Sequence, residues 1–387
     1  MWILSFATQL VLAETFIVEV GTPVEIRSAG AWIRVFPTED SWFAALGSNQ
    51  SFYVGELRKT GERLEDWELV DKRQVVEISG LIDHGIKKCP DGGYLHAASG
   101  MPPEVDETGP PIDYLHLWRY DENFNILAYS EFRSGMGTHA HNDPNVICAP
   151  DAKGLLLSIN GLQFATDFFS LDANLEVQEV IALQDYPRGN GGGVLYDVHA
   201  EEFIQLGMDH DKPLTVNRYD TNWTLLDSID VALVDAPLRA YWPQGAIQVG
   251  DYFIVAHMGR NEDWLGSDKG DVFLGVFTDE WQLVEQHRLT TFENGEAAMR
   301  PWVARKGEQL LVSFDLFNEQ QILEAKLDLN AFGLDGTEPD TGVDPQGEWN
   351  APIDSTSKRQ CGCGTAESAL WIPLLGFWTV FRSRKRV

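Results

Sequence analysis

The stretch Leu117-Trp-Arg-Tyr-Asp121 is a short strand-like segment that ends in an acidic turn residue, and similar stretches recur along the chain. The counterparts are Gly55-Glu-Leu-Arg-Lys59 before Gly61, Phe168-Phe-Ser-Leu-Asp172, Val216-Asn-Arg-Tyr-Asp220, Leu274-Gly-Val-Phe-Thr-Asp279 and Ala325-Lys-Leu-Asp328. The turn positions 61, 121, 172, 220, 279 and 328 are separated by 60, 51, 48, 59 and 49 residues. Repeats of about 40–50 residues that each hold several short strands are typical of β-propeller blades.

Each copy also contains an earlier apolar strand that begins at an acidic or glycine turn. These strands are Asp40-Ser-Trp-Phe-Ala-Ala-Leu46, Gly93-Tyr-Leu-His-Ala-Ala98, Gly154-Leu-Leu-Leu-Ser-Ile159, Glu202-Phe-Ile-Gln-Leu-Gly207, Asp251-Tyr-Phe-Ile-Val-Ala256 and Glu308-Gln-Leu-Leu-Val-Ser313. Acidic, Asn and Gly residues at turns favour tight antiparallel reversals. We therefore predict an all-β fold, a β-propeller of six blades with four antiparallel strands each; a pair of β-sandwiches is the alternative. The β-prone segment 15–26 is expected to pair with the last blade and close the ring.

The two ends of the chain differ in composition from the body. Residues 2–13 are uncharged and end in Val11-Leu12-Ala13, which predicts a signal peptide over 1–13 that is cut after Ala13. The segment lacks the usual basic start, so a first strand is the alternative. The propeller is expected over residues 14–334. Residues 335–360 are rich in Gly, Pro, Asp and Thr, which predicts a disordered linker.

The last segment, 361–387, combines cysteines, an apolar run and a basic end. Cys361-Gly-Cys363 precedes the apolar residues 369–381, and Arg382, Arg384, Lys385 and Arg386 follow them. This order resembles the MYXO-CTERM type of C-terminal sorting tail of myxobacteria, and the resemblance covers the tail alone. It implies export, cutting near Cys361 and Cys363, and display at the cell surface or outer membrane through the processed C-terminus. An ordinary membrane anchor is the alternative, although the run is shorter than the roughly 20 residues of a membrane-spanning helix.

Charge limits the classes of partner. The 387-residue chain has a formal net charge of −30, which disfavours binding to nucleic acid and to anionic lipid. We expect membrane contact through the C-terminal tail only, and a monomer. The body holds two of the four cysteines, Cys89 and Cys148. In an exported protein they are a candidate disulfide, with two buried thiols as the alternative.

The segments that precede the apolar strand of each copy combine polar and aromatic residues. In a propeller such loops surround the mouth of the central channel, so we expect their side chains to meet in one pocket. Aromatic faces beside hydrogen-bonding groups suit a glycan, and a surface protein is the alternative partner. The predicted ligand-binding residues are His84, His141, Asp143, Trp242, Gln244, Arg300 and Trp302, and Trp32 and Arg34 occupy the matching place in the first copy. Asp143 is expected beside Arg300, which would keep the carboxyl ionised. The opposite interpretation is that these residues close the channel by bonding to one another.

Hydrolysis of a polysaccharide is the rival function. The segment His141-Asn-Asp143-Pro-Asn145 resembles the channel-mouth Asp of five-bladed glycosidases. Glycosidases use two carboxylates; Asp143 is one candidate, with Asp83, Asp197 or Glu201 as the second. A His139-Ala-His141 pair is a weak zinc signal, and Asp121-Glu-Asn123-Phe-Asn125 lacks the Gly and Glu of a calcium loop. We therefore expect no metal and no cofactor, with calcium as a weak candidate, and we favour binding over catalysis.

Overall fold

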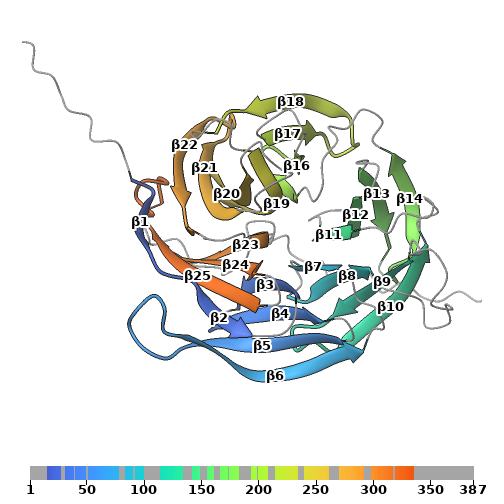
Figure 1. Cartoon of the computed structure of the whole chain (residues 1–387). Helices are drawn as coiled ribbons and strands as arrows, with labels where there is room; N and C mark the ends of the chain where they lie inside the picture. Colours follow the sequence, from blue (N-terminus) through green and yellow to red (C-terminus); the bar gives the residue numbers. More distant parts are fainter. Residues whose placement is uncertain are drawn as a thin grey trace, which may run out of the picture. The chain divides into compact units, whose positions relative to one another are not determined.

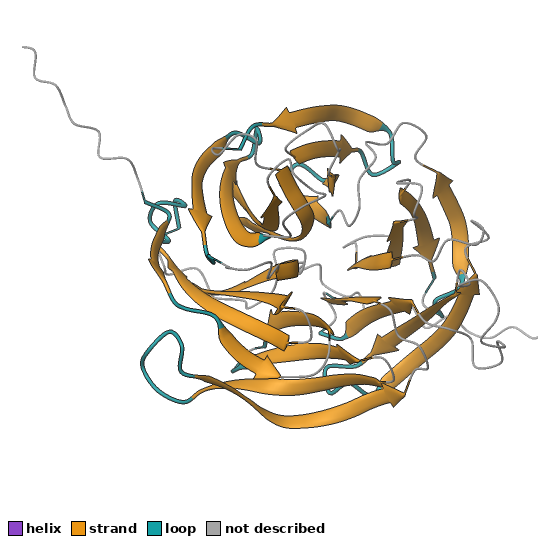
Figure 2. Ribbon diagram, in the orientation of Figure 1, coloured by secondary structure: helices purple, strands orange, loops and turns teal. Residues whose placement is uncertain are grey.

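The computed structural model describes residues 15–334, apart from 28–30, 39, 49–50, 78–82, 90–91, 100–113, 134–141, 149–154, 161–165, 173, 183–192, 198, 208–213, 234–238, 261–269, 292–297 and 317–318. The described residues form strands and turns (Figure 2). The chain divides into two compact units, 1–349 and 350–387, and the second lies outside the described residues. Within the described ranges no helix is long and apolar enough to cross a membrane.

Five blades each consist of four consecutive antiparallel strands. Blade I contains β3 (Ala31–Pro37), β4 (Trp42–Ser48), β5 (Ser51–Lys59) and β6 (Trp67–Glu77). Blade II contains β7 (Asp83–Lys88), β8 (Tyr94–Ser99), β9 (Tyr114–Tyr120) and β10 (Ile126–Arg133). Blade III contains β11 (Asn142–Cys148), β12 (Leu155–Asn160), β13 (Thr166–Leu171) and β14 (Val177–Ala182). Blade IV contains β15 (Val194–Asp197), β16 (Glu202–Gly207), β17 (Leu214–Tyr219) and β18 (Leu225–Val231). Blade V contains β19 (Arg239–Val249), β20 (Tyr252–Arg260), β21 (Asp271–Thr278) and β22 (Leu283–Arg288).

The remaining sheet, blade VI, joins the two ends of the propeller. It contains β23 (Ala298–Lys306), β24 (Gln309–Leu316) and β25 (Glu319–Leu327) from the end of the fold. The N-terminal strands β1 (Ile17–Val20) and β2 (Val24–Arg27) both pair with β25, so this sheet has five strands. The expected ring closure by segment 15–26 is confirmed. The expected count of six four-stranded blades is one too high, because the sixth sheet takes two short strands in place of one fourth strand.

The first strand of each blade lies innermost, and these strands contact one another in a ring. Contacts run from β3 to β7, β11, β15, β19, β23 and back to β3. Figure 1 shows the sheets arranged radially about this centre. The expected propeller fold is therefore correct. The innermost strands all begin at one end of the ring, which we call the bulge face. We call the opposite end the turn face.

Acidic residues stabilise the turns between the third and fourth strands of several blades. The Oδ1 atom of Asp121 accepts hydrogen bonds from the backbone N–H groups of Asn123 and Asn125 at 2.9 and 2.8 Å. The same two bonds recur at Asp172 and at Asp220. The conserved spacing in the sequence thus reflects an Asx turn in each of these blades, with the side-chain oxygen bonded to backbone rather than offered to a metal.

A large apolar residue lies within each of these turns, and within the matching turn between β21 and β22, in a left-handed backbone conformation. The φ angles of Phe124, Leu175, Trp223 and Trp281 are 59°, 67°, 63° and 61°. Such angles cost free energy in residues with a Cβ atom. The side chains offset that cost by packing under the turn; the Trp281 ring stacks on Phe253 with 4.6 Å between the centroids.

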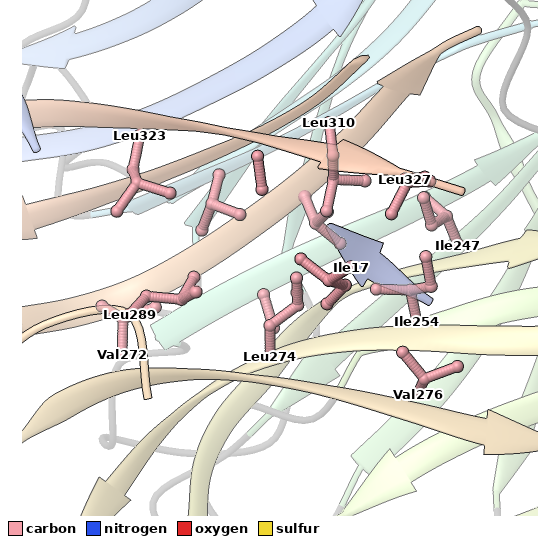
Figure 3. Packing of buried hydrophobic residues seen from close by; sticks show 14 of the residues in the cluster. Ile17, Ile247, Ile254, Val272, Leu274, Val276, Leu289, Leu310, Leu323 and Leu327 are labelled. Carbon is pink, nitrogen blue, oxygen red and sulfur yellow. The ribbon is translucent and has the colours of Figure 1, made fainter. Parts of the chain in front are cut away.

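The largest hydrophobic cluster lies between blades V and VI and includes the N-terminal strand. Ile17 of β1 is 3 % exposed and packs with Ile254 and Leu274 of blade V and Leu310 and Leu323 of blade VI (Figure 3). The closing strand is therefore held by apolar packing as well as by pairing with β25.

Candidate functional site: the bulge face of the ring

The polar and aromatic segments expected as loops are the innermost strands themselves. The apolar strand of each repeat is the second strand of its blade: β4, β8, β12, β16, β20 and β24. The first strand of each blade was predicted as a loop, because prolines and small residues interrupt the apolar pattern of β11, β19 and β23. Proline lacks the N–H group that a central strand donates, so it is compatible with a strand interior only at a bulge.

Four innermost strands bulge at the same place, near their first residues. The pairing register shifts between Ala31 and Ile33, Asn142 and Asn145, Tyr241 and Gly245, and Met299 and Trp302. The strands β7 and β15 pair without a shift. The residues that have no partner in the pairing register at these shifts are Trp32, Asp143-Pro144, Trp242-Pro243-Gln244 and Arg300-Pro301. Bulges re-aim side chains and are common beside functional sites. The ring therefore brings four of the predicted ligand-binding positions, Asp143, Trp242, Gln244 and Arg300, to one face.

Arg300 occupies the bulge of β23 in a strained conformation. Its φ angle is 53°, and its Nη1 atom lies 3.5 Å from Oδ2 of Asp315, whose side chain is fully buried in β24. The neighbouring blade supports this geometry, because Nη1 of Arg34 donates to the carbonyl oxygen of Arg300 at 3.3 Å. A non-glycine residue held at positive φ by its surroundings is a common feature of binding sites.

Trp302, two residues after Arg300, packs in the apolar cluster between blades VI and I. Its side chain is buried, and its Nε1 atom donates to the carbonyl oxygen of Val35 at 3.1 Å. The Arg34 guanidinium carbon lies 5.2 Å and the Lys87 Nζ atom 4.5 Å from the indole centroid, distances at which a cation attracts an aromatic ring. Three innermost strands, β3, β7 and β23, thus meet at one indole. Around Trp302 the predicted residues contact one another, as expected if they close the channel.

His84 begins a row of histidines that crosses blade II rather than opening to solvent. The His84 ring is fully buried, 5.3 Å from the rings of both Phe52 and His96. His96 contacts the Tyr120 hydroxyl through Nδ1 at 3.2 Å, and His116 contacts the Tyr129 hydroxyl through Nδ1 at 2.9 Å. This row lies against blade I, and His84 is placed inside the protein.

Burial favours the neutral form of His96, His116 and His257. Burial, and then the nearby His84 and His116, lower the pKa of His96 well below its ordinary value. Burial lowers the pKa of His116 to about 4. In blade V, burial likewise lowers the pKa of His257 to about 4, and its ring stacks on Phe273 at 5.6 Å.

Several predicted residues are described only in part or not at all. The structure places the backbones of Asp83, Asp143, Trp242 and Gln244 on β7, β11 and β19, and their side chains lie outside the description. His141 and the processing residues Ala13, Cys361 and Cys363 lie outside the described residues. The predicted Asp143–Arg300 pair thus stays a prediction. In the part of the chain that the structure describes, no group of three His, Cys, Asp or Glu residues is arranged to hold a metal.

Cys89 and Cys148 form a disulfide between blades II and III, with their Cα atoms 5.2 Å apart. Cys148 ends β11, and Cys89 directly follows β7, the neighbouring innermost strand.

Sequence reasoning did not find Lys87 and Asp315. Lys87 is followed by a second lysine at the end of an unremarkable strand, and Asp315 ends an apolar one. The prolines inside three innermost strands were the available signal, since they mark where the site's backbone bulges.

Comparison with known proteins supports the fold and no particular activity. Neither a protein-family model nor a curated protein matches the chain. A protein of unknown function from Dyadobacter fermentans is similar in structure, with a TM-score of 0.56, 11 % identity, and coverage of 81 % of this chain and 98 % of that one. A neuraminidase-like protein from A/little yellow-shouldered bat/Guatemala has a TM-score of 0.47, 14 % identity, and coverage of 80 % and 99 %. A gluconolactonase from Xanthomonas campestris has a TM-score of 0.46, 10 % identity, and coverage of 79 % and 89 %. The last two are too distant to support a functional argument, and the chain is a β-propeller whose site must be judged from its own residues.

Proposed function

We propose that this protein is an exported, surface-displayed propeller that binds a glycan at the bulge face of its ring. The observation that carries the proposal is the convergence of four bulged innermost strands. Their register shifts fall at Trp32, Asp143, Trp242 with Gln244, and Arg300, and the common position of these bulges near the strand starts supports one shared binding face. Indole faces with a few hydrogen-bonding groups are the combination that sugar rings require.

The lengths of the chain connections support the same face. The connections at 100–113, 134–141, 183–193 and 261–270 have 14, 8, 11 and 10 residues and join strand ends at the bulge face. The turns that start at Asp121, Asp172 and Asp220 are short and lie at the turn face. Longer connections on a rigid scaffold are where binding residues are usually found.

Binding is favoured over hydrolysis because of Asp315 and Trp302. Asp315 is the buried carboxylate beside Arg300, and its ion pair with that arginine at 3.5 Å engages the group that an acid catalyst would use. Trp302, next to the bulge of β23, is buried and bonded to Val35 and so is not offered to a substrate. Asp143 and Asp83 remain the candidate pair if the protein does cleave a polysaccharide.

The test is binding of oligosaccharides to the purified propeller, measured by titration calorimetry, with product analysis in the same samples. Asp143→Ala should abolish binding while the melting curve stays cooperative. Asp220→Ala is the matched control: it removes a carboxylate from a turn-face Asx turn, and binding should be unchanged. Binding that survives Asp143→Ala, or an absence of glycan binding across the panel, would refute the proposal. Release of shortened products would favour the hydrolase instead.

A further inference from the structure

Two cations approach one aromatic ring at the junction of blades VI and I. The guanidinium carbon of Arg27 and the Nζ atom of Lys72 lie 5.0 and 4.9 Å from the ring centroid of Tyr53. These residues belong to β2, β6 and β5, and β2 contacts β6 across the junction (Figure 1). The two cations are therefore at most about 10 Å apart, a separation at which salt of about 0.1 M screens charges only in part. We call Arg27, Tyr53 and Lys72 the outer cation site.

Neither cation has an acidic partner within the described residues, which is unusual in this protein. The chain has 59 Asp and Glu against 29 Lys and Arg, so a partner is available for most basic groups. Other basic side chains on third and fourth strands have one: Arg58 pairs with Glu56, Lys59 with Glu324, Arg218 with Glu202, Arg288 with Asp271 and Lys326 with Glu19. Arg27 and Lys72 thus keep positive charge that the described part of the chain does not neutralise.

Backbone bulges carry both cations. In β6, Asp71 and Lys72 stand opposite Gly55 alone. Asp71 has a left-handed φ angle of 50°, which is strained for a residue with a Cβ atom, and its carboxylate pairs with Arg58 at 3.8 Å. The register of β2 also shifts directly before Arg27. Bulges re-aim side chains and are common beside functional sites.

Arg27 is poorly solvated for a charged side chain. Its Nη1 atom is buried and has no hydrogen-bond partner among the described residues. Burial lowers the pKa of this guanidinium from its ordinary value. The face of Tyr53 attracts the cation but accepts no strong hydrogen bond from it. An oxygen atom of an anion at this place would accept the unused hydrogen bond and lower the free energy of the site.

The charges of the outer cation site favour a doubly charged oxyanion. A guanidinium and an ammonium carry two positive charges, and a phosphate monoester carries about 1.5 to 2 negative charges at pH 7 on three strong acceptor oxygens. The fork of an arginine bonds to two phosphate oxygens, while a lysine attracts the group as a point charge. A carboxylate has one charge and two oxygens, so it satisfies the pair less well.

We propose that Arg27 and Lys72 bind a phosphate group, free or as a monoester, beside the ring of Tyr53. This site uses no residue of the innermost strands, so the proposal is independent of glycan binding at the bulge face.

The experiment measures ion binding to the purified protein by titration calorimetry at constant ionic strength. The probes are inorganic phosphate, glucose 6-phosphate, acetate and glucose. We expect saturable binding of at least one phosphate compound, at least tenfold tighter than that of acetate, and no binding of glucose. The same compound at low millimolar concentration should raise the melting temperature, whereas higher concentrations of phosphate stabilise proteins in general. Tighter binding of inorganic phosphate identifies the free ion as the ligand, tighter binding of glucose 6-phosphate identifies a sugar phosphate, and both results support the site.

Variants locate the phosphate. Arg27→Gln and Lys72→Met each remove one positive charge, and each should weaken phosphate binding at least tenfold. Lys72 is exposed, so its replacement should leave the melting curve cooperative. Lys326→Met is the matched control, because it removes one positive charge from the same junction sheet, where Lys326 pairs with Glu19 at 2.7 Å. Phosphate binding of this control should equal that of the unmodified protein.

Three results would overturn the proposal. They are an absence of saturable phosphate binding, equal affinity for phosphate and acetate, and phosphate binding that both site variants retain. None of them bears on glycan binding, which uses other residues. If Arg27→Gln does not fold, Lys72→Met and the comparison of ions on the unmodified protein still decide.

Discussion

The indole of Trp302 on β23 donates a hydrogen bond to the carbonyl oxygen of Val35 on β3, which bonds the last blade directly to the first. Trp302 was predicted from the sequence as a ligand contact. It is only 4 % exposed, and its hydrogen bond to Val35 shows that it joins two blades. The hydrogen bond and the two flanking cations explain why a tryptophan, with both a donor and a large π face, suits this position.

Trp302→Phe should therefore destabilise the propeller. The phenyl ring keeps an aromatic face for Arg34 and Lys87 but leaves the Val35 carbonyl without its donor, a loss of about 1–3 kcal/mol. Urea unfolding measures the effect. A midpoint equal to that of the unmodified protein would mean that the bond between blades VI and I contributes nothing to stability.

The N-terminal strand should contribute to stability through one face only. Ile17→Ala should cost about 2–5 kcal/mol, because Ile17 is 3 % exposed in the cluster between blades V and VI. Val18→Ala on the same strand is the control; Val18 is 55 % exposed, and the change should stay within about 0.5 kcal/mol. Equal effects of the two substitutions would contradict the packing of β1 described above.

The disulfide should stabilise blades II and III. It joins residues 59 apart, and closing a loop of that length in the unfolded chain is worth about 4 kcal/mol. Reduction, or the double change Cys89→Ala and Cys148→Ala, should lower the melting temperature, and reductant should then have no further effect on the double variant. A melting curve of the unmodified protein that reductant does not shift would count against a stabilising bond.

Acid should destabilise the protein through its buried histidines. Burial lowers the pKa of His257 to about 4 from an ordinary value near 6.5, so the unfolded chain takes up this proton first as the pH falls. Stability linked to His257 is complete above pH 6.5 and is lost towards pH 4, by about 3 kcal/mol. His257→Phe should reduce the loss of stability between pH 7 and pH 4 by about 3 kcal/mol in urea titrations, while the share of His96 and His116 remains. The exposed His199 provides the control, and a pH dependence that falls in His199→Gln but not in His257→Phe would reverse the assignment.

Processing of the tail is testable on cells. If the C-terminal segment is a sorting tail, the mature surface protein should lack residues 382–387 in mass spectrometry. The protein should also start after Ala13. An intact C-terminus on surface protein would exclude the sorting tail and leave an ordinary anchor.

The sequence predicted the repeat well because its turns depend on side chains. Asp121, Asp172 and Asp220 are required at their places by the bonds that they accept, so the period is visible in the residue types. The closing strand was also predictable, since 15–26 is β-prone and has no partner of its own nearby. The number of strands in the sixth sheet was not predictable, because no sequence signal near β25 shows that two short strands pair with it.

The ligand-binding role of the site stays a prediction, and the strand structure of its segments was not predicted. The polar and aromatic segments were identified, yet bulges and prolines disguised β11, β19 and β23 as loops. Contacts across the channel depend on the curvature of the whole ring. The approach of Lys87 to Trp302 spans more than 200 positions in sequence and has no signature in either segment.

The closure of the ring also determines how the molecule would respond to tension. Strand β25 is flanked by β24 on one side and by β1 and β2 on the other, so it cannot be peeled from a free edge. A pull applied beyond residue 334 first meets Phe332, whose ring packs 4.9 Å from Phe16 and 5.6 Å from Tyr252. It must then shear two rows of backbone hydrogen bonds at once. A propeller tethered through its C-terminus would therefore carry mechanical load on a strand that is paired along both edges.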